Sequence, residues 1–194
     1  MRKWIGVICV LLGVICLFCS VGFVVYNYWE EESAAKITET LLEDAQSMIN
    51  EQNTTQDELQ IKMPTINVDG YDCIGILTIP VLDLELPVLT DWSYAKLKKA
   101  PCHYYGTYYE KDFVIAAHNY KSHFGRLSEL QAGDIVIFTD VNGADYCYEV
   151  VLLETLPKEA TQEMIASGFD LSLYTCTPGG ASRVTVRCSR ISGV

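Results

Sequence analysis

Residues 171–183 read LSLYTCTPGGASR and place a cysteine at the end of a short apolar, β-prone run. The Thr-Pro-Gly-Gly-Ala-Ser segment that follows fits neither a helix nor a central strand, because proline and paired glycines interrupt both. A new apolar run, RVTVRCSRI, begins at Arg183. The pattern predicts two strands joined by a loop, with Cys176 ending the first strand and Arg183 opening the second.

The first of these strands has two different faces, because successive side chains of a strand point to opposite sides. One face suits a hydrophobic core and carries Leu171, Leu173 and Thr175. The other face suits a groove and carries Ser172, Tyr174 and Cys176. We therefore predict that Ser172 and Tyr174 contribute to substrate binding beside the cysteine.

Short β-prone runs recur from about residue 71 to residue 191. They cover residues 74–89 with a break around Pro80 to Asp83, then 113–118, 134–140, 146–156, 171–176 and 183–191. Asn142-Gly143 marks a hairpin turn. Short helical segments are predicted at 93–99, with Ser93 as a cap, at 125–131 and at 158–167. About eight short strands with only small helices favour an all-β fold, a closed or nearly closed β-barrel.

The N-terminal segment is predicted to anchor the chain in a membrane. No charged residue occurs from Trp4 to Tyr28, and roughly 20 apolar residues suffice to cross a bilayer as a helix. Arg2 and Lys3 precede the run and three glutamates follow it, which predicts a cytoplasmic N-terminus and an extracellular remainder. A cleaved signal peptide is the alternative, but its apolar region is usually only about 7–15 residues long.

Between the anchor and the β-rich region, residues 34–49 show apolar positions at helical spacing and predict an amphipathic stalk helix. Residues 53–62 are polar and indicate a linker, in which Asn53 begins a glycosylation-type triplet. The predicted organisation is an anchor at 1–29, a stalk and linker at 30–70 and a catalytic barrel at 71–194.

The charge distribution limits the kinds of partner. All 25 acidic residues follow the apolar segment, and the net charge of the chain is −11. So acidic a domain is a poor nucleic-acid binder and has little electrostatic reason to lie flat on anionic lipid.

The cysteines indicate neither a disulfide scaffold nor a zinc site. Three of the eight belong to the apolar segment, and the other five are Cys73, Cys102, Cys147, Cys176 and Cys188. These five are widely spaced without a C-x-x-C pair, and no metal is predicted. Because their number is odd, at least one thiol stays free in a monomer. We assign that thiol to Cys176 and expect the other four to be small buried residues.

A nucleophilic cysteine needs a base or ion-pair partner and a group that holds the developing oxyanion. Of three histidines, His118 best fits the first role, because it closes the strand FVIAAH, whose small residue Ala116 leaves space for a ligand on the same face. Arg183 fits the second role, because the short loop brings it to the same end of the sheet as Cys176. Arg187 and Arg190, further along that strand, are expected to be solvated surface charges.

These residues resemble the signatures of the sortases, membrane-anchored cysteine transpeptidases of Gram-positive bacteria. The family's T-L-x-T-C motif corresponds to SLYTC, residues 172–176, and its strand-end histidine to His118 in IAAHNY. The family's arginine corresponds to Arg183. The entry pattern G-x-L-x-I-P and then L-x-x-x-L-P-V is present at 75–80 and 82–88. The three separated motifs occur in family order within residues 71–191.

The resemblance implies an eight-stranded barrel that cuts a C-terminal sorting signal of L-P-x-T-G type between threonine and glycine. Cys176 would form a thioacyl enzyme, and His118 would move protons to and from the amines. Arg183 would bind the substrate and the oxyanion, while Thr175 would order the strand. The implied partners are surface proteins with a sorting signal and a cell-wall precursor or pilin amine, at the cell membrane and without a cofactor. Calcium dependence, subclass and sorting motif stay open.

Two other functions remain as alternatives at this point. A membrane-anchored cysteine endopeptidase would release the same thioacyl intermediate with water. A non-catalytic surface module would bind partners with Cys176 as a bystander.

Overall fold

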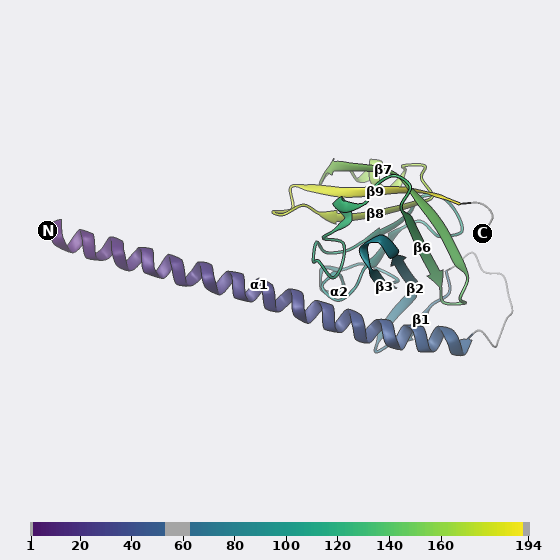
Figure 1. Ribbon diagram of the computed structural model, residues 1–194, viewed down its shortest axis with the longest axis horizontal. Coiled ribbons are helices and arrows are strands. Elements are labelled where there is room, and N and C mark those ends of the chain that lie inside the picture. Colours follow the sequence, from purple (N-terminus) through teal and green to yellow (C-terminus); the bar gives the residue numbers. More distant parts are fainter. Residues whose placement is uncertain (1, 53–62, 192–194) are drawn as a thin grey trace. The chain divides into compact units, whose positions relative to one another are not determined.

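The computed structural model describes residues 2–52 and 63–191 (Figure 1). Its residues fall into two units, Met1–Ser33 and Ala34–Val194. The predicted linker at 53–62 and its Asn53 triplet lie outside the described residues. The three-part division at residues 29 and 70 stays a prediction.

A single helix, α1 (Arg2–Gln52), contains both the predicted anchor and the predicted stalk. From residue 12 to residue 29 its apolar side chains are exposed, as Phe18 and Phe23 illustrate. Among the described residues, this is the one helix that is long and apolar enough to cross a membrane.

In the second unit the last part of α1 packs on the sheet. Its buried residues recur about once per turn and are Ala34, Thr38, Leu41, Ala45 and Ile49. Leu41, Ala45 and Ile49 form a small core with residues of β1 (Ile66–Val68) and β2 (Tyr71–Ile79). The segment predicted as a stalk therefore also covers one side of the barrel.

The barrel closes through eight strands. Besides β2, they are β3 (Leu84–Leu89), β4 (Cys102–Tyr105), β5 (Phe113–Ala116), β6 (Ile135–Asp140), β7 (Asp145–Pro157), β8 (Leu171–Cys176) and β9 (Ser182–Arg190). The order is β2-β3-β4-β5-β8-β9-β7-β6, and β6 pairs with β2 to complete the ring, while β1 adds to the edge of β2. The predicted all-β barrel is confirmed. The short strands β1 and β4 were not predicted.

The seam between β2 and β6 requires a glycine. Gly75 pairs with Asp140 and has φ +155°, and a Cβ atom there would stand 2.2 Å from the carbonyl oxygen of Thr139. Any side chain would push the two strands apart. The barrel interior is filled by large apolar side chains such as Phe113 and Phe138, and Cys188 faces this core as predicted.

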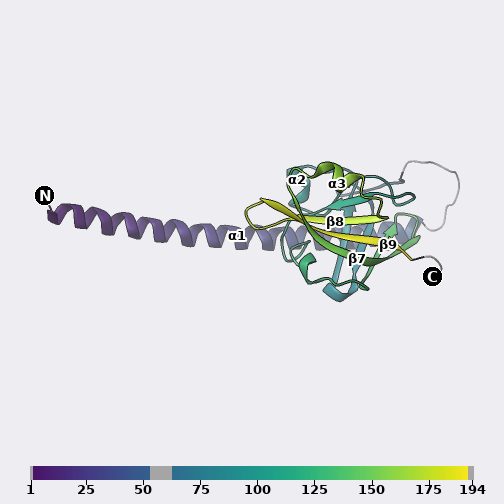
Figure 2. The ribbon, with the colours of Figure 1, turned by 90° about the horizontal axis from the view of Figure 1, so that it is seen from above.

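Short helices lie between the strands. Those predicted near 93–99, 125–131 and 158–167 are α2 (Tyr94–Leu97), η2 (Leu127–Glu129) and α3 (Thr161–Ile165), and η1 (Pro80–Leu82) lies in the predicted break between two strands. The Ser93 side chain accepts a hydrogen bond from the Lys96 amide and caps α2, which confirms the expected cap. Figure 2 shows α2 and α3 on the same side of the barrel, and both contribute side chains to one pocket.

Candidate active site

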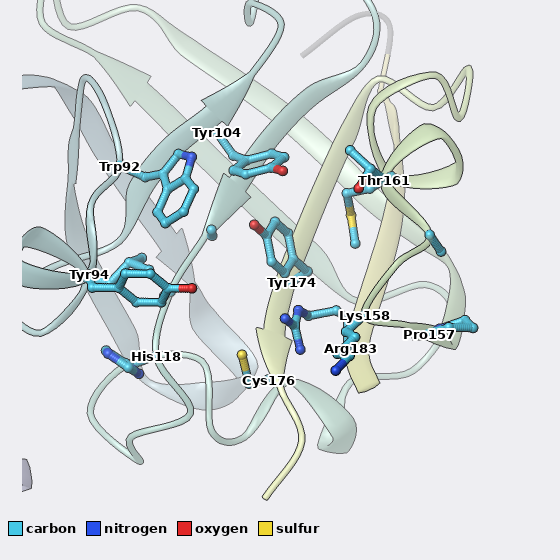
Figure 3. Close-up of a pocket in the computed structure, with 15 residues that line it drawn as sticks. Trp92, Tyr94, Tyr104, His118, Pro157, Lys158, Thr161, Tyr174, Cys176 and Arg183 are labelled. Carbon is cyan, nitrogen blue, oxygen red and sulfur yellow. The ribbon is translucent and has the colours of Figure 1, made fainter. Parts of the chain in front are cut away.

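One pocket of the barrel collects the predicted catalytic residues. Its lining comes from the ends of β5 and β8, from the start of β9 and from the segments around α2 and α3. The residues are Trp92, Tyr94, Leu97, Tyr104, Ala116, Ala117, His118, Pro157, Lys158, Ala160, Thr161, Met164, Tyr174, Cys176 and Arg183 (Figure 3).

Cys176 and Arg183 lie directly opposite each other. Their Cα atoms pair across the antiparallel strands β8 and β9, and both residues are half-buried. The connecting turn contains Gly179 and Gly180 with φ of 81° and 74°, a left-handed conformation that suits glycine. Arg183 Nη1 donates to the carbonyl oxygens of Gly180 and Ser182, both at 3.0 Å. The turn therefore holds the guanidinium beside the thiol.

His118 reaches the same end of the barrel from β5. The parallel pairing of β5 with β8 sets Ala116 opposite Tyr174, so the chain leaves both strands at one edge. Two further bonds join the strand ends. The Ala117 amide donates to the carbonyl of Tyr174 at 3.2 Å, and Thr175 Oγ1 donates to the carbonyl of Ala117 at 2.9 Å. The latter bond agrees with the ordering role expected for Thr175.

Aromatic side chains form one wall of the pocket. Tyr174 meets Tyr104 edge to face at 5.4 Å between ring centroids, and Trp92 lies 5.8 Å from Tyr104 and 5.6 Å from Tyr94. Burial raises the pKa of Tyr174 above its ordinary value, so its hydroxyl stays protonated. Sequence reasoning identified Tyr174 but missed the other three rings. They lie on separate segments, and only the fold brings them together.

The charged groups of the pocket are all basic. His118, Lys158 and Arg183 line it, and none of the described lining residues carries a carboxylate. This contrasts with the acidic balance of the chain. Basic side chains in the pocket stabilise an oxyanion that develops there.

Of the predicted substrate-binding residues, Tyr174 and Ala116 line the pocket and Ser172 does not. Ser172 is fully buried, and its hydroxyl accepts a hydrogen bond from Arg187 Nη1 at 2.7 Å. Ser172 does share a face of β8 with Tyr174 and Cys176, as the alternation predicted, but α3 covers the part of that face where Ser172 lies. Ser172 therefore supports Arg187 rather than the groove surface.

Arg187 and Arg190 are not the solvated charges expected from the sequence. Arg187 is 1% exposed and pairs with Glu154 at 2.8 Å. Arg190 bonds to the Tyr108 carbonyl and lies over the ring of Tyr146 at 4.9 Å. Segments distant in the sequence cover both side chains, which strand periodicity cannot reveal.

The remaining cysteines of the barrel differ from Cys176. Burial raises the pKa of Cys73, Cys102 and Cys188 to about 12, so these thiols remain protonated and unreactive at neutral pH. Cys147 is only half-buried, which corrects the expectation that it is buried, and it does not line the pocket. All five are free thiols.

The other histidines are held by internal bonds. His103 Nδ1 lies 2.9 Å from the carbonyl oxygen of Thr90, and His103 Nε2 lies 2.8 Å from the carbonyl oxygen of Gly106. His123 is fully buried, with Nε2 at 2.8 Å from Thr38 Oγ1. Over residues 12–49 and 63–191, no group of three or more His, Cys, Asp or Glu side chains is placed to hold a metal ion.

Comparison with known proteins identifies the family. The family model described as "Sortase domain" matches residues 77–191. A sortase D5 transpeptidase from Clostridium perfringens is 19% identical with a TM-score of 0.62, and the match covers 81% of this chain and 99% of that one. Sortase C of Streptococcus pneumoniae is 23% identical, covering 84% and 94%, with a TM-score of 0.58.

A lid mutant of sortase A from Corynebacterium diphtheriae is 20% identical, covering 80% of this chain and 94% of that one, with a TM-score of 0.56. The TM-scores of these matches show a shared fold. A search among curated proteins gave no significant match. The family model spans more than half of the chain and contains Cys176, His118 and Arg183. The chain belongs to the sortase family of cysteine transpeptidases.

Proposed function

We propose that Cys176 is the nucleophile of this transpeptidase. Its sulfur attacks the carbonyl carbon of the threonine in a sorting signal of Leu-Pro-Xaa-Thr-Gly type, and the carbonyl oxygen becomes an oxyanion. The tetrahedral intermediate collapses as the threonine–glycine C–N bond breaks. The product is a thioester between the substrate and Cys176. The observation that carries this proposal is that Cys176, His118 and Arg183 line one pocket.

His118 is proposed to move the protons of both half-reactions. It donates a proton to the amine nitrogen that leaves with glycine, because an amide anion is too poor a leaving group. It then removes a proton from the incoming amine of a cell-wall precursor or pilin, which attacks the thioester and frees the Cys176 sulfur. One proton is given and one is recovered, so the enzyme returns to its starting state.

Arg183 is proposed to stabilise the oxyanion and to bind the substrate backbone. The turn at Gly180 already fixes its guanidinium beside Cys176, so little reorganisation is needed when charge develops. Tyr174 and Ala116 border the same groove, and we propose that they contact the Leu-Pro part of the signal together with Trp92 and Tyr104.

We further propose that α1 anchors the enzyme with its N-terminus in the cytoplasm and the barrel outside. Among solved structures of similar fold, one is of Clostridium perfringens sortase C with the C-terminal cell wall sorting motif, and another, of Streptococcus pneumoniae sortase C, concerns pilin substrate specificity. Surface proteins with a sorting signal are the proposed substrates here. Tethering enzyme and substrate to one membrane raises their effective concentration.

A transfer assay tests this function. The full-length protein in detergent micelles is incubated with a Leu-Pro-Xaa-Thr-Gly peptide library, with and without triglycine or diaminopimelic acid. We expect cleavage after threonine and an acyl–amine conjugate in the mass spectrum when acceptor is present. Hydrolysed peptide alone, in the presence of abundant acceptor, would favour the endopeptidase alternative and contradict the transferase.

A further inference from the structure

The segment that carries His118 is joined to α1 through a buried histidine. His123 is fully buried and Thr38 is 4% exposed, although one lies between β5 and β6 and the other lies on α1. Their side chains meet with His123 Nε2 at 2.8 Å from Thr38 Oγ1. The bond links residues 85 positions apart in the sequence.

The backbone carbonyl of Lys99 fixes the direction of the hydrogen bond between Thr38 and His123. Thr38 Oγ1 donates to the backbone carbonyl of Lys99, which can only accept. A threonine hydroxyl has one proton, so towards His123 it must act as acceptor. His123 therefore carries its proton on Nε2. Its Nδ1 is buried and has no hydrogen-bond partner among the described residues, as expected for a neutral ring.

The charge of His123 bears directly on its neighbour. Burial, and secondly the charge of His118, lower the pKa of His123 to about 4, so it stays neutral at physiological pH. A second cation close to His118 would oppose protonation of His118. A neutral His123 leaves His118 able to carry the proton that the transfer reaction requires.

Tyr120 completes the path between the two imidazoles. Its ring stacks on His118 at 4.8 Å and lies 5.4 Å from the ring of His123. The segment is closed by backbone bonds from the His123 amide to the Tyr120 carbonyl at 3.0 Å and from the Phe124 amide to the His118 carbonyl at 3.1 Å. A displacement of His123 would therefore move the residues that hold His118.

We propose that Thr38 and His123 are positioning residues that latch the catalytic histidine segment to α1, so that the helix leading out of the membrane helps to set the orientation of His118. The inference rests on the proposed role of His118 in proton transfer. It gives residues 34–49 a part in catalysis beyond tethering. The latch consists of Thr38, His123 and the Lys99 carbonyl.

A set of threonine variants tests the latch in the full-length protein in micelles. Thr38→Val keeps the shape of the side chain and removes the hydroxyl. We expect kcat for transfer of a Leu-Pro-Xaa-Thr-Gly peptide to triglycine to fall about tenfold with KM nearly unchanged, since proton transfer rather than substrate binding is disturbed. Thr38→Ser restores the hydroxyl and should recover most of kcat.

Thr40→Val is the matched control. Thr40 is exposed on the same helix, and its hydroxyl donates only to the Lys36 carbonyl one turn back. This variant should keep the wild-type kcat. Unchanged kcat in Thr38→Val, or an equal loss in Thr38→Ser or Thr40→Val, would overturn the latch. A wild-type protein that transfers nothing would instead refute the proposed function itself.

A second pair of variants covers the case that Thr38→Val does not fold. His123→Gln places an amide donor near the position of Nε2 and should keep most of kcat, whereas His123→Leu cannot donate and should lose it. Thermal unfolding followed by circular dichroism shows whether each variant is folded at the assay temperature. Equal kcat in folded Gln and Leu variants would contradict the latch.

Discussion

Cys176→Ala is expected to lower the rate of transfer by about a thousandfold or more, because it removes the proposed nucleophile and the one thiol among the described residues that line the pocket. Cys176 is half-buried at the end of β8, so the truncation leaves the barrel core intact. The melting temperature should therefore stay close to that of the wild type. The rate is measured as conjugate formed per unit time with the peptide library and triglycine.

The matched control for this variant is Cys188→Ala. Cys188 is fully buried in the core and burial raises its pKa to about 12, so it has no part in nucleophilic chemistry. Its truncation should leave turnover nearly normal and reduce stability by about 1 kcal/mol or somewhat more through the small cavity. Wild-type turnover in Cys176→Ala, or its loss in folded Cys188→Ala, would refute the assignment of the nucleophile.

Arg187→Met is expected to cost about 3 kcal/mol of folding stability, because it leaves several buried partners without their donor. Arg187 binds the Glu154 carboxylate at 2.8 Å and the Ser172 hydroxyl at 2.7 Å. It also donates to the carbonyls of Met164 and Glu163, at 3.3 and 2.7 Å. Urea unfolding of the wild type and the variant measures the difference.

The same substitution should raise KM more than it lowers kcat. Thr161 and Met164 of α3 border the pocket, and Arg187 holds α3 by donating to the carbonyl oxygens of Glu163 and Met164. Arg126→Met is the control, since Arg126 is only half-buried, pairs with Glu129 at the surface and donates to one backbone carbonyl, that of Leu82, and surface pairs contribute little. Wild-type stability in Arg187→Met, or equal damage in Arg126→Met, would contradict the structural role of Arg187.

The sequence sufficed for the parts of the site that depend on local pattern. The apolar run ending at Cys176, the Pro-Gly-Gly loop and Arg183 directly after it define two adjacent strands, and the structure pairs these residues. Strand alternation also identified Tyr174 and Ala116 as groove residues. The end of the strand FVIAAH indicated His118, which the parallel pairing of β5 and β8 brings to the same edge.

Contacts with segments distant in the sequence account for what the sequence did not predict. Arg187 and Ser172 occupy outward positions of their strands, but α3 lies over them and buries both. Thr38 reads as a polar position of an amphipathic helix, yet it lies against His123. The four-residue strand β4 has no apolar alternation, because its sequence is CHYY, and its pairing partners alone define it.

The proposal that Cys176 forms the thioacyl intermediate is tested most directly by finding which residue carries the acyl group. The full-length enzyme is mixed with sorting-signal peptide without acceptor, quenched in acid and digested with trypsin, and the fragments are weighed. Residues 159–183 form a tryptic fragment in which Cys176 is the one cysteine. The account predicts the added mass of the Leu-Pro-Xaa-Thr acyl group on this fragment. The same mass on a fragment containing Cys147 or Cys188, with none on 159–183, would contradict it.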